Sequence, residues 1–324
     1  MLGFLINRLL QAAAVMAVMS VIVFVGVYAI GNPMDVLIPP DATQQIRAEV
    51  VARYGLDRPL VEQYLSFAGN LLQGDFGRSF VFNLPVGELI LARLPATAEL
   101  ALAAVLGASL LGIPLGIYAG YRPNSPVSRA IMGVSILGFS VPTFWVGLIL
   151  ILTFAVELRW LPAGGRGPTA EILGVPWSFT SLEGLSHLLL PAFNLALFKL
   201  ALLIRLARAG TREAMLSDYV KFARAQGQTE LTVLRGHVLK NISIPIVTVF
   251  GLELGSTLAF AVVTETIFSW PGLGKLIIDS IRDLDRPVMV AYLVLVTFTF
   301  VVINFAVDLV YGALDPRLRP GGAG

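Results

Sequence analysis

The sequence predicts an all-helical protein that crosses a membrane several times. Of its 324 residues, 56% are hydrophobic and only 14% are charged, whereas about a quarter of the residues in a soluble domain are charged. The mean hydropathy of +0.80 indicates the same class. The apolar residues also gather in separate runs of roughly 20 residues, the length that a helix needs to cross the hydrocarbon core. These observations exclude an ordinary water-soluble domain.

Six such runs occur, and each is interpreted as one membrane-spanning helix. The first run could instead be a secretory signal. It is longer than the apolar core of a cleaved signal, about 7–15 residues, and it lacks a small-residue cleavage site before Asn32-Pro33. We therefore expect it to remain as the first span. The predicted spans cover residues 9–30, 97–119, 131–156, 186–206, 245–268 and 288–312.

Six spans place both ends of the chain on one side, and the basic residues indicate which side. The ends and loops of that side carry more than twice as many lysines and arginines as the two shorter loops of the other side. Residues 31–95 are left out because loops of that length cross with little regard to charge. Since cytoplasmic loops are enriched in basic residues, both termini are predicted to be cytoplasmic.

This topology divides the chain into four parts, and the second contains two stretches with apolar residues at helical spacing. Short amphipathic helices are expected there, with Pro59 starting the second of them. The four parts are the cytoplasmic N-terminus with the first span (1–30), an extracytoplasmic segment (31–95), a core of five transmembrane helices (96–312) and a cytoplasmic tail (313–324).

The longest cytoplasmic segment of the core, residues 207–244, is basic and is predicted to form two helical pieces. Ser217 or Asp218 can cap the first piece and Thr229 the second, while Gly227 supplies the left-handed residue that ends a helix. A short amphipathic helix held between two spans is suited to lie in a groove of a cytoplasmic partner. An ordinary basic loop is the alternative that the pattern leaves open.

Ionisable residues inside the predicted spans are functional candidates, because each costs some kcal/mol unless it is paired or hydrated. Glu253 lies deepest, and it and Glu265 are the candidates for lining a translocation pathway. A buried hydrogen bond between helices is the alternative for Glu253. The two carboxylates are separated by about 120° around a helix, so they do not share one narrow face. The candidates are Glu99, Lys199, Glu253, Glu265 and Asp308.

A stripe of glycines marks the second predicted span. Gly112, Gly116 and Gly120 repeat every four residues, a spacing that lets another helix approach closely. Packing is the role expected of this stripe.

Residues suited to chemistry are scarce. There is no cysteine and there are two histidines, which excludes disulfides, thiol nucleophiles and a Cys/His metal cage. The nearest approach to a phosphate-binding loop, Gly274-Lys275, has Ser269 where glycine is needed and Leu276 where a hydroxyl is needed. The net charge of +2 excludes the broad basic surface of a nucleic-acid-binding protein. A non-catalytic chain without a cofactor or metal of its own is expected.

Several segments resemble one family. Ala223-Arg224-Ala225-Gln226-Gly227 and the later Ile244-Pro245 are similar to the coupling-loop signature of ATP-binding cassette importer permeases. Ala-Arg-Ala stands here in place of the general Glu-Ala-Ala, as in the dipeptide, oligopeptide, nickel and glutathione branch. Further similar segments are Arg8–Leu10, Leu56–Leu60, Gln73–Ser79, Leu94–Thr97, Phe268–Gly274 and Asp315–Arg317. The resemblance covers essentially the whole chain.

The resemblance implies a type I permease fold and a subunit of an ATP-driven importer in a bacterial-type inner membrane. It implies four kinds of partner: a homologous second permease, two cytoplasmic ATPase subunits or domains, an extracytoplasmic substrate-binding protein and the membrane lipid. ATP and Mg would bind to the ATPases. Peptides or related small solutes would be the substrate.

The resemblance also implies a coupling helix near residues 218–231 that contacts the ATPase. Within it, small residues would fit a groove, apolar residues would anchor the helix, and the arginine would pair with acidic groups of the partner. These residues are Tyr219, Phe222, Ala223, Arg224, Ala225, Gly227 and Leu231.

Two other functions are weighed beside the importer. An ion-coupled secondary transporter would favour several carboxylates at the membrane centre and matching halves, but the sequence has one deep carboxylate and no visible duplication. A non-transporting membrane scaffold would use the basic loop to recruit cytosolic proteins or anionic lipid. That function explains the loop and not the other segments.

Overall fold

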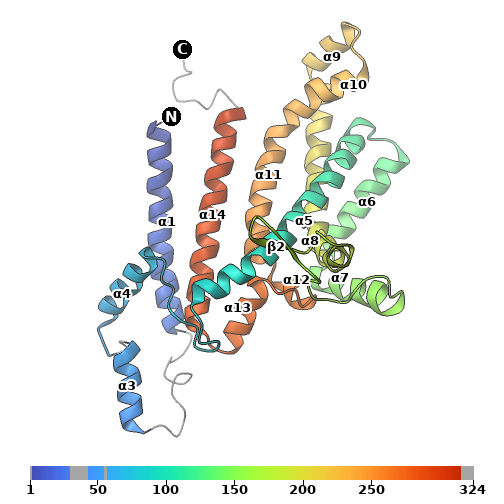
Figure 1. Ribbon diagram of the computed structural model, residues 1–324. Coiled ribbons are helices and arrows are strands. Elements are labelled where there is room, and N and C mark those ends of the chain that lie inside the picture. Colours follow the sequence, from blue (N-terminus) through green and yellow to red (C-terminus); the bar gives the residue numbers. More distant parts are fainter. Residues whose placement is uncertain (1, 30–42, 55–56, 315–324) are drawn as a thin grey trace. The chain divides into compact units, whose positions relative to one another are not determined.

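The structure is a computed structural model built almost entirely of helices (Figure 1). It describes residues 2–29, 43–54 and 57–314, so the predicted tail from residue 315 onward lies outside it. The chain forms two compact units. Unit 1 comprises residues 1–95 and 271–302, and unit 2 comprises residues 96–270 and 303–324.

Unit 1 contains the first long helix and two short helices. In α1 (Leu2–Ala29), Val23 is buried in an apolar cluster with Val294, and Leu71 packs against it. Where apolar spacing predicts two short helices, the structure has α3 (Gln44–Tyr54) and α4 (Leu60–Leu72). Pro59 occupies the N-cap of α4, one residue before its expected place.

A buried carboxylate joins the two sequence segments of unit 1. α13 (Leu273–Arg282) precedes α14 (Arg286–Leu314), and Asp285 lies between them. Asp285 is fully buried and accepts hydrogen bonds from the hydroxyl of Ser79 and from the backbone N–H of Phe80 (3.0 Å). The loop before α5 is thereby fixed to the start of α14.

Unit 2 is a helical bundle in which α8 packs against α6, α7 and α11. Side-chain caps start two of its helices: Ser125 accepts a hydrogen bond from the N–H of Ser128, and Ser181 from that of Gly184. The elements are α5 (Val86–Tyr121, which begins in unit 1), α6 (Pro126–Ser140), α7 (Thr143–Leu150), the π-helical segment η1 (Ile151–Glu157), β1 (Ala170–Ile172), β2 (Val175–Trp177), α8 (Leu182–Leu216), α11 (Leu239–Phe260) and α12 (Val262–Ile267).

The described residues contain four helices long and apolar enough to cross a membrane, or six spans if each of two bent helix pairs counts as one. The predicted third span, 131–156, is one of the bent pairs, with an angle of 104° between its halves. Pro142 explains the bend, because proline disfavours helical backbone in the preceding residue and Val141 is extended (φ −92°, ψ 132°). Helices also extend beyond two predicted spans: α5 begins at Val86 and α8 continues to Leu216.

The small antiparallel hairpin β1–β2 is absent from the all-helical prediction. Ala170 pairs with Trp177 and Ile172 with Val175. The two turn residues, Leu173 and Gly174, both have positive φ (54° and 74°), as the tight two-residue turns that match strand twist require. Too few residues are involved for an alternating apolar pattern to reveal the strands.

The glycine stripe of α5 packs directly on α8. A Cβ atom added to Gly116 would lie 2.5 Å from the carbonyl oxygen of Ile204 and 2.6 Å from the Cβ of Ala207. One added to Gly120 would lie 2.7 Å from the carbonyl oxygen of Arg208. The packing role predicted for the stripe is confirmed.

Replacing Gly116 with alanine is expected to destabilise unit 2 by about 1–3 kcal/mol, because the new methyl group meets backbone atoms that must shift. The thermal unfolding midpoint of the purified protein in mild detergent measures this loss. Gly107→Ala is the matched control on the same helix, since nothing lies within 4 Å of its added Cβ. Equal midpoints for the two variants would contradict the packing assignment.

Candidate functional site

The segment between α8 and α11 folds into two short helices at one end of unit 2 (Figure 1). They are α9 (Asp218–Ala225) and α10 (Glu230–Val233), and the π-helical turn η2 (Leu234–Val238) leads from α10 into α11. Gly227 has a φ of +80°, and the Thr229 hydroxyl accepts a hydrogen bond from the N–H of Thr232. The predicted break and second cap are therefore present, while the second piece continues into α11 without interruption.

α9 has one face buried within the chain and one face exposed. Val220 and Ala223 are 0% and 2% exposed and pack with Val233 of α10. On the other face, the exposed fractions are 41% for Tyr219 and 65% for Phe222. The two faces follow from the helical spacing i, i+3.

The other residues that the family resemblance implies as ATPase contacts are also partly exposed and partly buried. Leu231 is 57% exposed, and Ala225 and Gly227 are exposed. Ala223 has no such surface, because its small side chain serves the close approach of α9 to α10. Three large apolar side chains of α9 and α10 are thus exposed, Tyr219, Phe222 and Leu231, and we call this set the α9 surface.

Two ion pairs lie at the surface of this region. Arg224 donates two hydrogen bonds to Glu230, from Nε to Oε1 (2.9 Å) and from Nη2 to Oε2 (3.1 Å), and this hydrogen bonding lowers the pKa of Glu230. Lys221 donates to Asp218 (2.8 Å) and lowers its pKa in the same way. These pairs are exposed, so each stabilises the fold only slightly.

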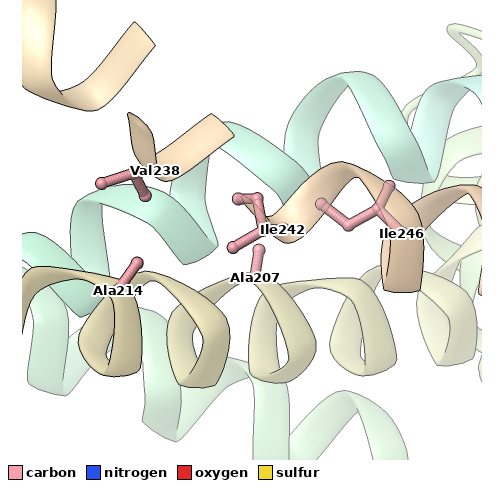
Figure 2. Close-up of a cluster of buried hydrophobic side chains, with 5 residues drawn as sticks. All are labelled: Ala207, Ala214, Val238, Ile242 and Ile246. Carbon is pink, nitrogen blue, oxygen red and sulfur yellow. The ribbon is translucent and has the colours of Figure 1, made fainter. Parts of the chain in front are cut away.

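A packed apolar cluster joins α8 to η2 and α11 next to the two short helices (Figure 2). Ala207 and Ala214 of α8 face Val238, Ile242 and Ile246 on the η2–α11 side, and all five side chains are buried. The alanines allow the two helices to lie close together. Met215 at the end of α8 packs against both this cluster and the cluster of Val220, Ala223 and Val233, so it connects α9 and α10 to the α8–α11 contact.

A buried ion pair joins the same two helices deeper along their length. Lys199 Nζ of α8 lies 2.8 Å from Glu253 Oε2 of α11, and the side chains are 8% and 17% exposed. Ser256 Oγ lies 3.4 Å from the same carboxylate oxygen. The sequence leaves two roles open for Glu253, a hydrogen bond between helices and a place on the pathway. The structure shows the hydrogen bond between helices.

Glu265 is 0% exposed and accepts a hydrogen bond from Thr97 Oγ1 (2.6 Å). This bond joins α12 to α5. Glu265 and Glu253 have different partners in the bonds described here, Thr97 of α5 and Lys199 of α8.

Sequence reasoning missed the partners of another buried carboxylate. Glu99 of α5 is 2% exposed and accepts five hydrogen bonds, from Arg166, Ser178 and the N–H of Phe179. Arg166 also donates to the carbonyl oxygen of Pro176 in β2 (2.6 Å). This cluster fixes the hairpin to α5. An unpaired glutamate in a predicted span was the only signal, since its partner lies 67 residues away in a loop.

Comparison with family models decides where this architecture belongs. Residues 112–320 match the family described as the binding-protein-dependent transport system inner membrane component, and residues 1–101 match its N-terminal region. The chain belongs to this permease family. The permease is therefore a non-catalytic, multi-pass subunit of the inner membrane. Its family works with an ATPase and a substrate-binding protein.

Curated relatives match the permease over nearly its whole length. The oligopeptide transport system permease protein AppB of Bacillus subtilis is 39% identical and covers 98% of this chain and 100% of its own. The di/tripeptide transport system permease protein DppB of Pseudomonas aeruginosa is 40% identical, with coverages of 89% and 90%. The glutathione transport system permease protein GsiC of Escherichia coli is 35% identical, with coverages of 98% and 99%.

A solved structure supports the fold. The MetNI methionine ABC transporter in an inward-facing conformation matches with a TM-score of 0.56, covering 70% of this chain and 96% of that chain. At 16% identity this likeness concerns the fold alone. The predicted permease fold is confirmed, and the importer interpretation is favoured over the secondary transporter and the scaffold.

Proposed function

We propose that the permease forms half of the translocation pathway of an ATP-driven importer of peptides or related small solutes. Support comes from the relatives, whose names specify oligopeptides, di- and tripeptides and glutathione. A homologous second permease completes the pathway, and ATP and Mg bind to the two ATPases. Both termini lie in the cytoplasm, so α9 and α10 face the ATPases and the hairpin faces the binding protein.

The α9 surface is the observation that carries the proposed coupling role. Three large apolar side chains are exposed on a segment whose other exposed residues are polar or small, and an amphipathic helix of this kind is suited to a groove on a partner. Phe222 is the principal anchor because it is 65% exposed. Arg224 adds a positive charge beside the anchors and can exchange Glu230 for an acidic group of the ATPase. Ala225 and Gly227 leave room for the groove wall.

Coupling then follows from the packing behind the α9 surface. When the ATPases close on ATP, the groove displaces α9, and the buried face at Val220 and Ala223 carries α10 along. The cluster of Figure 2 passes this displacement to α8 and α11. The pathway thereby changes from inward-facing to outward-facing as a switch between two packed arrangements.

Glu253 and Glu265 are proposed to serve the pathway in different ways. The Glu253 side chain is 17% exposed beside a more deeply buried lysine, so part of the carboxylate is accessible from the pathway. Glu265 contributes by holding α12 against α5 through Thr97.

Crosslinking tests the contact directly, because the chain contains no cysteine that would compete. Phe222→Cys should form a disulfide-length crosslink with an ATPase that carries a cysteine in its groove. Leu173→Cys is the control, since Leu173 is 98% exposed at the hairpin tip and should face the other side of the membrane. Crosslinking of Leu173 and not of Phe222 would reverse the proposed orientation.

Reconstitution tests transport itself. Vesicles that contain the two permeases and the ATPases should accumulate peptide only when ATP and the binding protein are both supplied. Uptake driven by an ion gradient in the absence of the ATPases would reject the proposal.

A further inference from the structure

One side of α4 carries apolar side chains that no described part of the chain covers. Val61, Leu65 and Leu72 are 69%, 62% and 89% exposed. They lie four and seven residues apart, so at 100° per residue they fall within about 40° of one another around the helix axis. We call these three residues the α4 stripe.

A second side of α4 is polar. Glu62, Ser66 and Asn70 are exposed, and their spacing of four residues places them in one row on the helix. The centre of this polar row lies about 120° around the axis from the centre of the α4 stripe. The helix therefore exposes an apolar surface and a polar surface on different sides.

The third side of α4 packs on α1. The ring of Phe24 contacts the rings of Tyr64 and Phe67, at centroid distances of 5.4 and 5.7 Å. Tyr64 also reaches Ser20, four residues earlier in α1, where the two hydroxyl oxygens lie 2.9 Å apart. These contacts attach α4 to a helix that is long and apolar enough to cross a membrane.

Contacts near both of its ends show that α4 crosses α1. Tyr64 and Leu71 are separated by about 10 Å along α4. Tyr64 nevertheless meets α1 at residues 20 and 24, and Leu71 packs against the cluster that contains Val23. Both contacts thus lie at the same level of α1, which a helix running alongside α1 would not allow.

The order of residues around α4 gives the direction of the α4 stripe. Around the axis, the polar row is followed by Phe67, then by Tyr64 and then by the α4 stripe. Tyr64 reaches Ser20, whereas Phe67 contacts Phe24. The α4 stripe therefore lies on the side of α4 that faces the middle of α1, and the polar row lies on the side toward Gly26.

The contacts with α4 lie near one end of the membrane span of α1. That span, Ile6–Gly26, has 21 residues and a helical length of about 32 Å. It matches the hydrocarbon core of about 30 Å, so its length fixes its level in the membrane. Ser20 and Phe24 are about 9 and 3 Å before Gly26. A helix that lies in the membrane interface buries its apolar face to a similar depth, about 5–10 Å.

We propose that α4 is an interfacial helix and that the acyl chains of lipid at this end of α1 cover the α4 stripe. The stripe continues the apolar surface of α1, where the neighbouring Val21 and Val25 are 45% and 59% exposed. The polar row then contacts headgroups and water. The boundary between acyl chains and water offers both surroundings along one helix. This role is independent of the transported solute and of the coupling to ATP.

Spin labelling of the assembled transporter in liposomes tests the proposal, because the permease has no cysteine of its own. A nitroxide is attached to Leu65→Cys or to the matched control Ser66→Cys, with partner subunits from which cysteine has been removed. Both positions are exposed, so neither replacement removes a packed side chain. Two collision rates are compared, one with oxygen, which dissolves in acyl chains, and one with a polar nickel chelate, which stays in water.

The ratio of oxygen to nickel collisions is expected to be about tenfold higher at Leu65→Cys than at Ser66→Cys, because the acyl chains exclude the polar chelate. Frequent nickel collisions at both positions would show that the α4 stripe faces water and would overturn the proposal. Rare collisions with both reagents at Leu65→Cys would overturn it too, since a second permease or the binding protein would then cover the stripe.

Two further positions test whether the whole surface behaves in the same way. Val61→Cys should give the collision ratio of Leu65→Cys, and Asn70→Cys should give that of Ser66→Cys. The reverse assignment would place the polar row in lipid and contradict the direction inferred for the α4 stripe.

Discussion

Replacing Gly227 with valine is expected to reduce ATP-driven uptake at least tenfold while the permease still folds and inserts. Gly227 has a φ of +80°, a conformation that a β-branched residue adopts only with strain of about 1–3 kcal/mol. The turn relieves that strain by changing its dihedral angles, and α9 then leaves the orientation that presents Tyr219 and Phe222. Uptake into vesicles, normalised to the amount of permease in the membrane fraction, measures the loss.

Space alone cannot cause this effect, because nothing lies within 4 Å of a Cβ atom added at Gly227. Gly227→Asn is therefore the decisive control. Asparagine tolerates the left-handed region much better than valine, so this variant should retain most of the uptake although its side chain is larger than that of alanine. Normal uptake by Gly227→Val would contradict the assignment of this turn to coupling, and equal loss in both variants would show that side-chain size matters instead of backbone conformation.

The α9 region illustrates what a sequence can predict. Its break, its second cap and its amphipathic spacing each depend on residues within a few positions of one another, so local patterns suffice. The glycine stripe of α5 could be predicted for the same reason. A four-residue repeat lies on one face of a helix, whichever helix packs against that face. The local pattern in α9 does not show which of its two faces is buried within the chain. Ala223 belongs to the family signature, yet its contact is Val233 of the same chain.

The buried charges show where local patterns fail. Glu99 and Arg166 are brought together by the fold of a long loop, and Lys199 meets Glu253 only because α8 packs on α11. Hydropathy thus locates the spans but does not predict which charged residues the fold brings together.

Removing one partner of the Lys199–Glu253 pair is expected to destabilise the permease by about 3–5 kcal/mol, because the other charge stays buried without a partner. In Lys199→Met, the methionine side chain is nearly as long as that of lysine and Glu253 is left unpaired. The loss of stability therefore reflects the lost charge more than a change in volume. Glu253→Gln leaves the ammonium unpaired in turn. Both single variants should show a lower thermal midpoint in detergent and a smaller amount of folded protein in the membrane.

The double variant Lys199→Met/Glu253→Gln removes both charges and should recover most of the lost stability, since neutral partners carry no comparable desolvation cost. Its transport then separates the two roles of Glu253. If the pair only fastens α8 to α11, the stable double variant transports at the normal rate. If Glu253 also serves the pathway, as its partly exposed side chain suggests, uptake falls although stability has returned. A double variant no more stable than the single variants would show that the pair acts through a specific geometry that neutral residues cannot replace.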